Sequence, residues 1–160
     1  MIRNVHPDDA EAICGIYNHY VLNTTITFEE EPVSVETMRQ RVRDVTHSFP
    51  WILADENGIV AGYAYACPWK TRSAYRHTVE SGIYLHKDSM GKGVGTLLYG
   101  ELLRLLREGG FHAVIGGIAL PNPASIALHE KLGFVNIGRF KEVGFKFGKW
   151  IDVGYWELML

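Results

Sequence analysis

Hydrophobic and polar residues alternate along the chain with two periods, which predict strands in some segments and helices in others. Seven short apolar runs predict strands, at residues 2–5, 51–54, 59–67, 77–85, 113–118, 134–141 and 151–159. Helical spacing predicts four helices, at residues 7–22, after Ser34, from Val94 to Gly109 and from Asn122 to Gly133. This order predicts an α+β fold, in which a mixed, mostly antiparallel, twisted sheet has helices on both faces.

Two local signals add detail to this pattern. Asn57-Gly58 separates two strand-like runs, and because both residues tolerate positive φ, the pair predicts a hairpin. The helix that begins at Val94 has the clearest amphipathic pattern, and we expect its apolar stripe to face the core. The stripe consists of Val94, Leu97, Leu98, Leu102, Leu105 and Leu106.

Length, composition and charge limit the class of protein. The 160 residues suit a single domain spanning 1–160, and 47% hydrophobic with 21% charged residues is typical of a globular protein with a buried core. A net charge of −2 argues against nucleic acid or a membrane surface as partner. No apolar run approaches the roughly 20 residues that span a bilayer, and Met1-Ile2-Arg3 does not begin a signal peptide. Cys14 and Cys67 form no C-x-x-C pair, so we expect a reduced, cytoplasmic protein.

The segment Gly91-Lys92-Gly93-Val94-Gly95 joins a predicted strand to a predicted helix. Glycines allow close approach of the backbone to an anion, and the N–H groups and dipole of a helix N-terminus attract negative charge. A dinucleotide-binding fingerprint is excluded because Thr96 occupies its third glycine position, and a P-loop is excluded because Gly93 follows Lys92. By itself the segment indicates either a phosphate-binding loop or an ordinary turn.

Several motifs together resemble one known superfamily. Residues 90–95 resemble the pyrophosphate-binding loop of the GNAT acyltransferases, although Met90 replaces the usual Gln or Arg, and residues 122–134 resemble their second cofactor motif. Residues 16–20, 75–85 and 144–153 are similar to segments of phosphinothricin and methionine sulfoximine N-acetyltransferases. The resemblance covers nearly the whole chain and implies a GNAT fold, acetyl-CoA as co-substrate and transfer of its acetyl group to an amine.

The resemblance also implies which residues bind the co-substrate. Backbone groups of Ile83, Tyr84 and Leu85 would pair with its pantetheine arm, and the Leu85 amide would face the thioester oxygen. Asn122 would contact pantetheine, although it also suits a helix cap, and Lys131 would lie near the polar end. The pyrophosphate would be held by backbone N–H groups of Gly91, Lys92, Gly93, Val94, Gly95 and Thr96.

Two residues are candidates for moving protons. Glu80 would act as general base, because an amine is mostly protonated at neutral pH and a carboxylate within an apolar strand is unusual. The alternatives are a solvated glutamate or an ion pair with Arg76. His129 occupies the position at which many GNAT enzymes have a tyrosine that protonates the leaving thiolate; it could donate that proton, relay one from the amine, or only pack. A zinc site is not supported, because His129-Glu130 lacks the second histidine of H-E-x-x-H.

Substrate contacts are expected from the segment between two of the strands and from one more distant position. By analogy with the subfamily these residues are Lys70, Thr71, Arg72, Glu80, Ser81 and Gly82. Phe28 and Glu29 would form another wall of the pocket, and Tyr75 and Trp69 would either add aromatic surface or pack in the core. Arg72 would bind a carboxylate through two hydrogen bonds, unless it is only a surface charge.

The residues leave several questions open. The implied acceptor is a small amino acid, and the implied assembly is a homodimer. The natural substrate cannot be inferred from the sequence, and a polyamine, a protein N-terminus or a non-catalytic acetyl-CoA-binding role remain alternatives.

Overall fold

The computed structural model describes residues 1–160, which form one seven-stranded sheet flanked by four α-helices. The strands lie in the order β1-β2-β3-β4-β5-β7-β6, and only the β4–β5 pair is parallel. The mixed, mostly antiparallel sheet predicted from the sequence is therefore confirmed. The strands are β1 (Ile2–Asn4), β2 (Trp51–Glu56), β3 (Ile59–Pro68), β4 (Thr78–Leu85), β5 (Ala113–Ala119), β6 (Val135–Lys146) and β7 (Lys149–Met159).

The helices begin close to the predicted positions. They are α1 (Ala10–Asn23), α2 (Val35–Thr46), α3 (Val94–Glu108) and α4 (Pro123–Lys131). Ser34 caps α2, since its side-chain oxygen accepts a hydrogen bond from the Thr37 N–H at 3.1 Å. The first turn predicted for α1 is instead a short 3-10 helix, Pro7–Asp9. No helix is long and apolar enough to cross a membrane.

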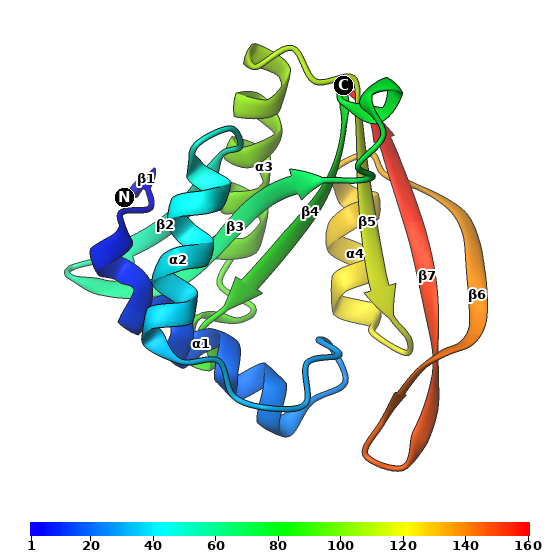
Figure 1. Ribbon diagram of the computed structural model, residues 1–160, viewed down its shortest axis with the longest axis horizontal. Helices are drawn as coiled ribbons and strands as arrows, with labels where there is room; N and C mark the ends of the chain where they lie inside the picture. Colours follow the sequence, from blue (N-terminus) through cyan, green and yellow to red (C-terminus); the bar gives the residue numbers. More distant parts are fainter.

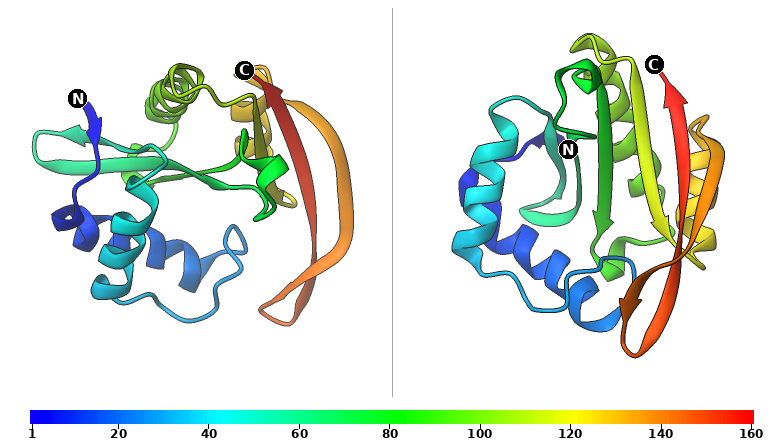
Figure 2. Two further views of the ribbon diagram at one scale, coloured as in Figure 1. Left: turned by 45° about the horizontal axis from the view of Figure 1, so that its top comes forward. Right: turned by 45° about the vertical axis from the view of Figure 1, so that its right-hand side comes forward.

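The helices cover opposite faces of the sheet, as predicted (Figure 2). On one face, α1 and α2 pack against Trp51, Leu53 and Tyr63 of β2 and β3. On the other, α3 packs against neighbouring strand residues such as Ile52 and Ala64. Alternate residues of a strand point to opposite faces, so β2 and β3 contribute to both clusters of core residues.

One part of the predicted stripe on α3 is wrong. Leu97 is 69% exposed, whereas Tyr99 is fully buried and takes part in the core. The buried face of α3 is rotated about the helix axis, away from Leu97 and toward Tyr99, relative to the face that the leucine pattern indicates. The Tyr99 side chain therefore lies between the backbone of α3 and the sheet, which the hydrophobic pattern did not indicate.

The last two strands are longer than predicted. The sequence pattern ended one strand at residue 141 and began the next at 151, but β6 and β7 pair as far as Lys146 and Lys149. Phe147 and Gly148 connect them with φ angles of 52° and 71°, the geometry of a two-residue hairpin turn. The turn was missed because phenylalanine is not a residue that usually adopts positive φ.

The centre of the sheet is split between β4 and β5. These strands pair only from Thr78 to Glu80, opposite Ala113 to Ile115, and then diverge toward their C-terminal ends (Figure 1). The sheet is therefore open along half of β4. Backbone groups and side chains at this opening are accessible to a ligand.

Candidate active site

A cleft of about 560 Å³ occupies the opening between β4 and β5. Its walls come from α1, β3, β4, β5, β6, β7, α4, and the loop between α1 and α2, residues 24–34. Eight of the residues predicted to bind or react line it: Phe28, Glu80, Ser81, Gly82, Ile83, Tyr84, Asn122 and His129.

The exposed edge of β4 offers unpaired amides to this cleft. The His86 N–H donates to the Ala61 carbonyl of β3 at 2.8 Å. Hydrogen-bonding direction alternates along an antiparallel strand, so the N–H groups of Ile83 and Leu85 point away from β3, toward β5. Because β5 has already diverged, an extended ligand could pair with these groups as an added strand. The Leu85 side chain itself packs in the core.

Glu80 is half-buried at the point where the two strands part. Burial raises the pKa of its carboxyl, and the positive charge of Lys70 partly opposes this. Arg76 does not pair with Glu80, since its guanidinium donates to the Ser73 carbonyl. Gly117 of β5 faces this carboxylate, since a methyl group there would lie 3.4 Å from Glu80 Oε1, at ordinary van der Waals distance. The carboxylate therefore lines the cleft, and its raised pKa makes it a stronger proton acceptor than an exposed glutamate.

His129 lies on α4, on the same cleft, and is only 4% exposed. Its Nδ1 is 2.7 Å from the Ser125 carbonyl, and its Nε2 is 3.0 Å from the Tyr99 hydroxyl. Burial lowers the pKa of the imidazole, while the hydrogen bond to Ser125 has the opposite effect. We therefore expect neutral His129 at pH 7.

The glycine-rich segment has the geometry of an anion-binding loop. Gly91 and Gly93 have φ angles of 72° and 83°, which an L-side chain rarely adopts, and Gly93 is the N-cap of α3. The first N–H groups of a helix have no intrahelical partner, and the first turn of α3 contains no acidic residue that would repel an anion. Gly95 lies against Leu85 at the end of β4, so the loop adjoins the open strand edge. These features fit the acetyl-CoA predicted from the sequence.

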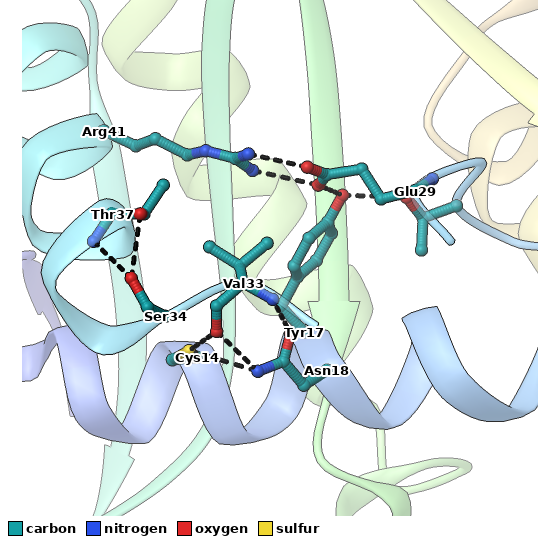
Figure 3. A network of polar contacts seen from close by, with 9 residues as sticks. Cys14, Tyr17, Asn18, Glu29, Val33, Ser34, Thr37 and Arg41 are labelled. Carbon is teal, nitrogen blue, oxygen red and sulfur yellow. Dashed lines mark hydrogen bonds and ion pairs between the residues drawn. The ribbon is translucent and has the colours of Figure 1, made fainter. Parts of the chain in front are cut away.

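The loop of residues 24–34 forms the opposite wall of the cleft and is held by polar contacts (Figure 3). The Glu29 carboxylate accepts two hydrogen bonds from Arg41, at 2.6 and 2.9 Å, and a third from the Tyr17 hydroxyl. The Asn18 side-chain amide donates to the Val33 carbonyl and accepts from the Val33 N–H, both at 2.8 Å. These contacts fix a segment that has no regular structure of its own.

The β6–β7 hairpin reaches the same loop from the other side (Figure 2). Lys146 of β6 is 1% exposed, and its ammonium donates to the Thr27 carbonyl at 2.8 Å. The Phe28 ring packs so closely over Gly144 that a methyl group there would overlap the ring. The loop is thus fixed between the helices and the hairpin.

Comparison with known proteins assigns the family. Residues 2–154 match the model of the acetyltransferase (GNAT) domain. The chain is a GNAT acetyltransferase. As a family member with this cleft and loop, it is an N-acetyltransferase that uses acetyl-CoA, which confirms the predicted activity and co-substrate.

Two curated relatives have substrate-specific names. A phosphinothricin N-acetyltransferase of Streptomyces viridochromogenes is 40% identical over 98% of this chain and 85% of its own. An L-methionine sulfoximine/L-methionine sulfone acetyltransferase of Salmonella typhimurium is 36% identical over 99% of this chain and 94% of its own. The predicted resemblance to this subfamily of GNAT enzymes is confirmed.

Two solved structures of GNAT enzymes superpose closely. A phosphinothricin acetyltransferase from Sinorhizobium meliloti in complex with acetyl-CoA is 40% identical, with a TM-score of 0.97, and covers 100% of this chain and 88% of that one. A ribosomal-protein-alanine N-acetyltransferase from Brucella melitensis is 36% identical, with a TM-score of 0.98, and the match covers 100% of this chain and 99% of that one. The names of these two proteins thus point to different amine substrates.

Some of the predicted site residues of this GNAT enzyme lie outside the cleft lining. Lys70, Thr71, Arg72 and Tyr75 are exposed in the segment between β3 and β4, where the Arg72 guanidinium lies 5.5 Å from the centre of the Tyr75 ring. Lys92 is exposed within the glycine-rich loop, and Lys131 is exposed at the end of α4. Their assigned contacts remain predictions.

Other residues of the GNAT cleft were not found from the sequence. Tyr17, Tyr65, Cys67 and Tyr155 line it, although the sequence pattern assigned none of them to a binding or catalytic site. Burial beside Glu80 raises the pKa of the Cys67 thiol to about 11, so this thiol stays protonated at neutral pH. Tyr99 lies behind the cleft wall, where only the hydrogen bonds of its hydroxyl connect it to the site.

We expect Arg41→Met to raise the KM for the amine about three- to tenfold while kcat changes less than about twofold. Loss of the guanidinium removes two of the three hydrogen bonds to the Glu29 carboxylate and loosens the loop that positions Phe28. Both side chains are more than a third exposed, so stability should fall by no more than about 1 kcal/mol. Steady-state kinetics and thermal unfolding measure these effects.

Arg104→Met is the matched control. Arg104 makes a comparable set of ion pairs, with Glu101 and Glu108, on the exposed side of α3. Its loss should leave both kinetic constants unchanged. Equal KM values for the Arg41 and Arg104 variants would contradict a role of the Glu29–Arg41 pair in shaping the cleft.

Proposed function

We propose that this enzyme acetylates the α-amine of a small amino acid or a glutamate-like analogue such as phosphinothricin, methionine sulfoximine or methionine sulfone. The main supporting observation is the half-buried Glu80 carboxylate on the wall of a cleft that adjoins an open strand edge. The names of two close relatives support the substrate class.

Acetyl-CoA supplies an acetyl group activated as a thioester. The outward-facing amides of Ile83 and Leu85 would hold its extended arm, and the Leu85 N–H is our candidate donor to the thioester oxygen. The N–H groups at the start of α3, residues 91–96, would bind its pyrophosphate. Asn122 can serve in both of its predicted roles, because its side chain caps α4 through the Ser125 N–H at 3.2 Å and also lines the cleft.

Glu80 would take a proton from the substrate ammonium, so that the neutral amine can attack the thioester. Its raised pKa makes the carboxylate a better proton acceptor than an exposed glutamate. The side chains of Phe28 and Tyr155 border the same space and would limit the size of the acceptor.

The α-carboxylate of an amino acid needs a cation, and no lysine or arginine lines the cleft itself. The candidates are Lys70, whose charge acts on Glu80, and Arg72, two residues further along the segment that leads into β4. We expect Arg72→Gln to raise the KM for the amino acid about tenfold with little change in kcat, because a lost charge-assisted pair weakens binding by one to a few kcal/mol. The same kinetics on Arg139→Gln, a variant of the outer strand β6, provide the control. An unchanged KM in Arg72→Gln would exclude it as the carboxylate ligand.

A panel of amines tests the proposed substrate class directly. Thiol release from acetyl-CoA would be measured with L-phosphinothricin, L-methionine sulfoximine, L-methionine sulfone, spermidine and a peptide that begins with alanine. Turnover confined to the amino-acid analogues supports the proposal. Turnover only with the peptide would favour the second candidate, acetylation of protein N-termini, which the name of the Brucella melitensis structure suggests. Binding of acetyl-CoA without any turnover would favour a regulatory role.

We further propose that the enzyme is a cytoplasmic homodimer. Phe145 and Trp150 pair on the β6–β7 hairpin and are more than half exposed, as is Phe140, and such an apolar surface is typical of an interface. Both Cys14 and Cys67 are free thiols, as expected in a reducing compartment. Sedimentation equilibrium would test the dimer, and a mass of 18.0 kDa would contradict it.

A further inference from the structure

Three polar side chains from three elements form a continuous hydrogen-bonded chain beside the cleft. Ser81 Oγ of β4 lies 2.6 Å from the Tyr99 hydroxyl of α3, which lies 3.0 Å from His129 Nε2 of α4. His129 Nδ1 completes the chain at the Ser125 carbonyl, 2.7 Å away. Ser81 and His129 line the cleft, whereas Tyr99 is fully buried between them.

The direction of these hydrogen bonds follows from their chemistry. A carbonyl oxygen can only accept, so His129 Nδ1 must bear a hydrogen. Neutral imidazole has one N–H, which leaves Nε2 as an acceptor for the Tyr99 hydroxyl. The Tyr99 oxygen can then accept the hydrogen of Ser81. In the resting state every donor therefore points inward, from the cleft toward His129.

The same groups also allow the opposite direction. When Nε2 is protonated, it donates to the Tyr99 oxygen, and Tyr99 can turn its hydrogen to Ser81. Ser81 then has another acceptor, the Ile115 carbonyl at 3.4 Å. Each hydroxyl keeps an acceptor for its hydrogen in both arrangements, which is the requirement for passing a proton along the chain.

We propose that Ser81, Tyr99 and His129 form a proton-transfer chain in which Ser81 receives a proton from the cleft and His129 holds it at the buried end. Tyr99 acts through its neighbours, as a positioning residue that joins them. The proposal rests on the acetyltransferase function proposed above and assigns it a second proton acceptor besides Glu80.

The proton balance of the reaction gives such a second acceptor a role, between loss of the proton from nitrogen and its arrival at sulfur. An ammonium group loses two protons when its nitrogen becomes part of an amide, and the sulfur of CoA gains one when the C–S bond breaks. Glu80 can hold only one proton, which it later releases to solvent. The other would pass to Ser81 as Ser81 gives its own to Tyr99 and Tyr99 gives its own to Nε2. It would return by the reverse shifts and protonate the sulfur.

The titratable groups around His129 do not provide a simpler partner. On α3 the group that faces it is Tyr99, and β5 presents only Gly116. Glu80 of β4 faces Gly117, whereas His129 faces Gly116, so the two side chains lie toward opposite faces of β5. Glu130 accepts from Trp156 Nε1 at 3.2 Å, away from the imidazole, and Lys131 is exposed at the end of α4. The chain through Tyr99 is thus the connection that the structure provides.

The first test needs no substrate. Nuclear magnetic resonance of the imidazole nitrogens, assigned by their loss in His129→Gln, would report the tautomer and titration of His129 in the free enzyme. We expect a protonated Nδ1 and a bare Nε2 at pH 7. In Tyr99→Phe the imidazolium loses its only acceptor at Nε2, so the His129 pKa should fall further. If Tyr99 only packed against His129, the opposite change would be expected. Water entering the loosened site would then raise the His129 pKa toward its ordinary value.

The second test measures turnover. We expect Tyr99→Phe to lower kcat about tenfold or more and to change neither KM by more than about twofold, since Tyr99 does not line the cleft. Ser81→Ala should lower kcat similarly, and the double variant should lose little more, because both changes interrupt one chain. Tyr63→Phe, which removes the hydroxyl of another buried tyrosine outside the cleft, is the control and should retain wild-type kcat.

These outcomes separate the two proposals. If the wild-type enzyme acetylates no amine in the panel, the proposed function fails, while the titration of His129 still decides the direction of the chain. If the wild type is active, a wild-type kcat in Tyr99→Phe would overturn the proton-transfer chain. A His129 pKa that rises in this variant, or kcat losses that multiply in the double variant, would overturn it as well.

Discussion

Glu80→Gln should lower kcat at least tenfold and leave the affinity for acetyl-CoA nearly unchanged. Glutamine has almost the same shape but cannot accept a proton, and general-base catalysis commonly contributes about 10²- to 10⁴-fold. The carboxylate lies where β4 and β5 part and faces Gly117 of β5. It is not part of the glycine-rich loop that begins α3. Steady-state kinetics give kcat, and calorimetry with acetyl-CoA gives the affinity.

The pH profile provides a second measure of the same role. Activity requires ionised Glu80, so it should fall as the pH decreases through the carboxyl pKa, which burial raises above its usual range. The acid limb of kcat/KM should therefore appear at higher pH than an exposed glutamate would give, and it should be absent from Glu80→Gln. Glu56→Gln, at the exposed end of β2, is the control. Wild-type turnover in Glu80→Gln would exclude Glu80 as the base.

The fold was largely predictable because most of its elements have local causes. Ser34 and Asn57-Gly58 act through their own backbone neighbours, and the strand runs alternate as their burial requires. The error on α3 arose because a distant contact decides which face of the helix is buried. Leu97 belongs to a regular leucine pattern, yet the sheet contacts the neighbouring helix face that contains Tyr99.

The candidate site was predictable for a different reason. Glu80, Asn122 and His129 belong to short motifs that resemble a family, so a contiguous stretch of sequence was sufficient to find them. Tyr99 has no such motif: its hydroxyl matters because β4 and α4 place Ser81 and His129 on either side of it. Likewise, Glu29 and Arg41 are 12 residues apart and meet only through the path of the loop between α1 and α2. Such pairs depend on tertiary distances, which hydrophobic periodicity does not encode.

Gly116→Ala should lower kcat at least tenfold, because the added methyl group would occupy the place of the His129 imidazole. It would lie 2.6 Å from Nε2 and 2.7 Å from Cδ2, well inside van der Waals contact. Gly116 is paired with Trp156 inside the sheet, so the strand cannot easily move away. The imidazole must shift instead, and its hydrogen bonds to Tyr99 and Ser125 would be lost or distorted. Overpacking of this kind should also lower the free energy of unfolding by about 1–3 kcal/mol.

Gly100→Ala separates the effect on catalysis from that on stability. Gly100 lies in α3 with nothing near the position of an added methyl group, so alanine should leave kcat unchanged and raise stability by about 0.4–1 kcal/mol. Thiol-release kinetics and thermal unfolding of both variants would be compared at a temperature at which each is folded. A Gly116→Ala enzyme with a lowered melting temperature and wild-type kcat would show that the position of His129 does not matter for turnover. The predicted outcome, a loss of kcat in a folded protein, would instead place the imidazole in the proton-transfer steps, because Gly116 itself supplies no chemical group.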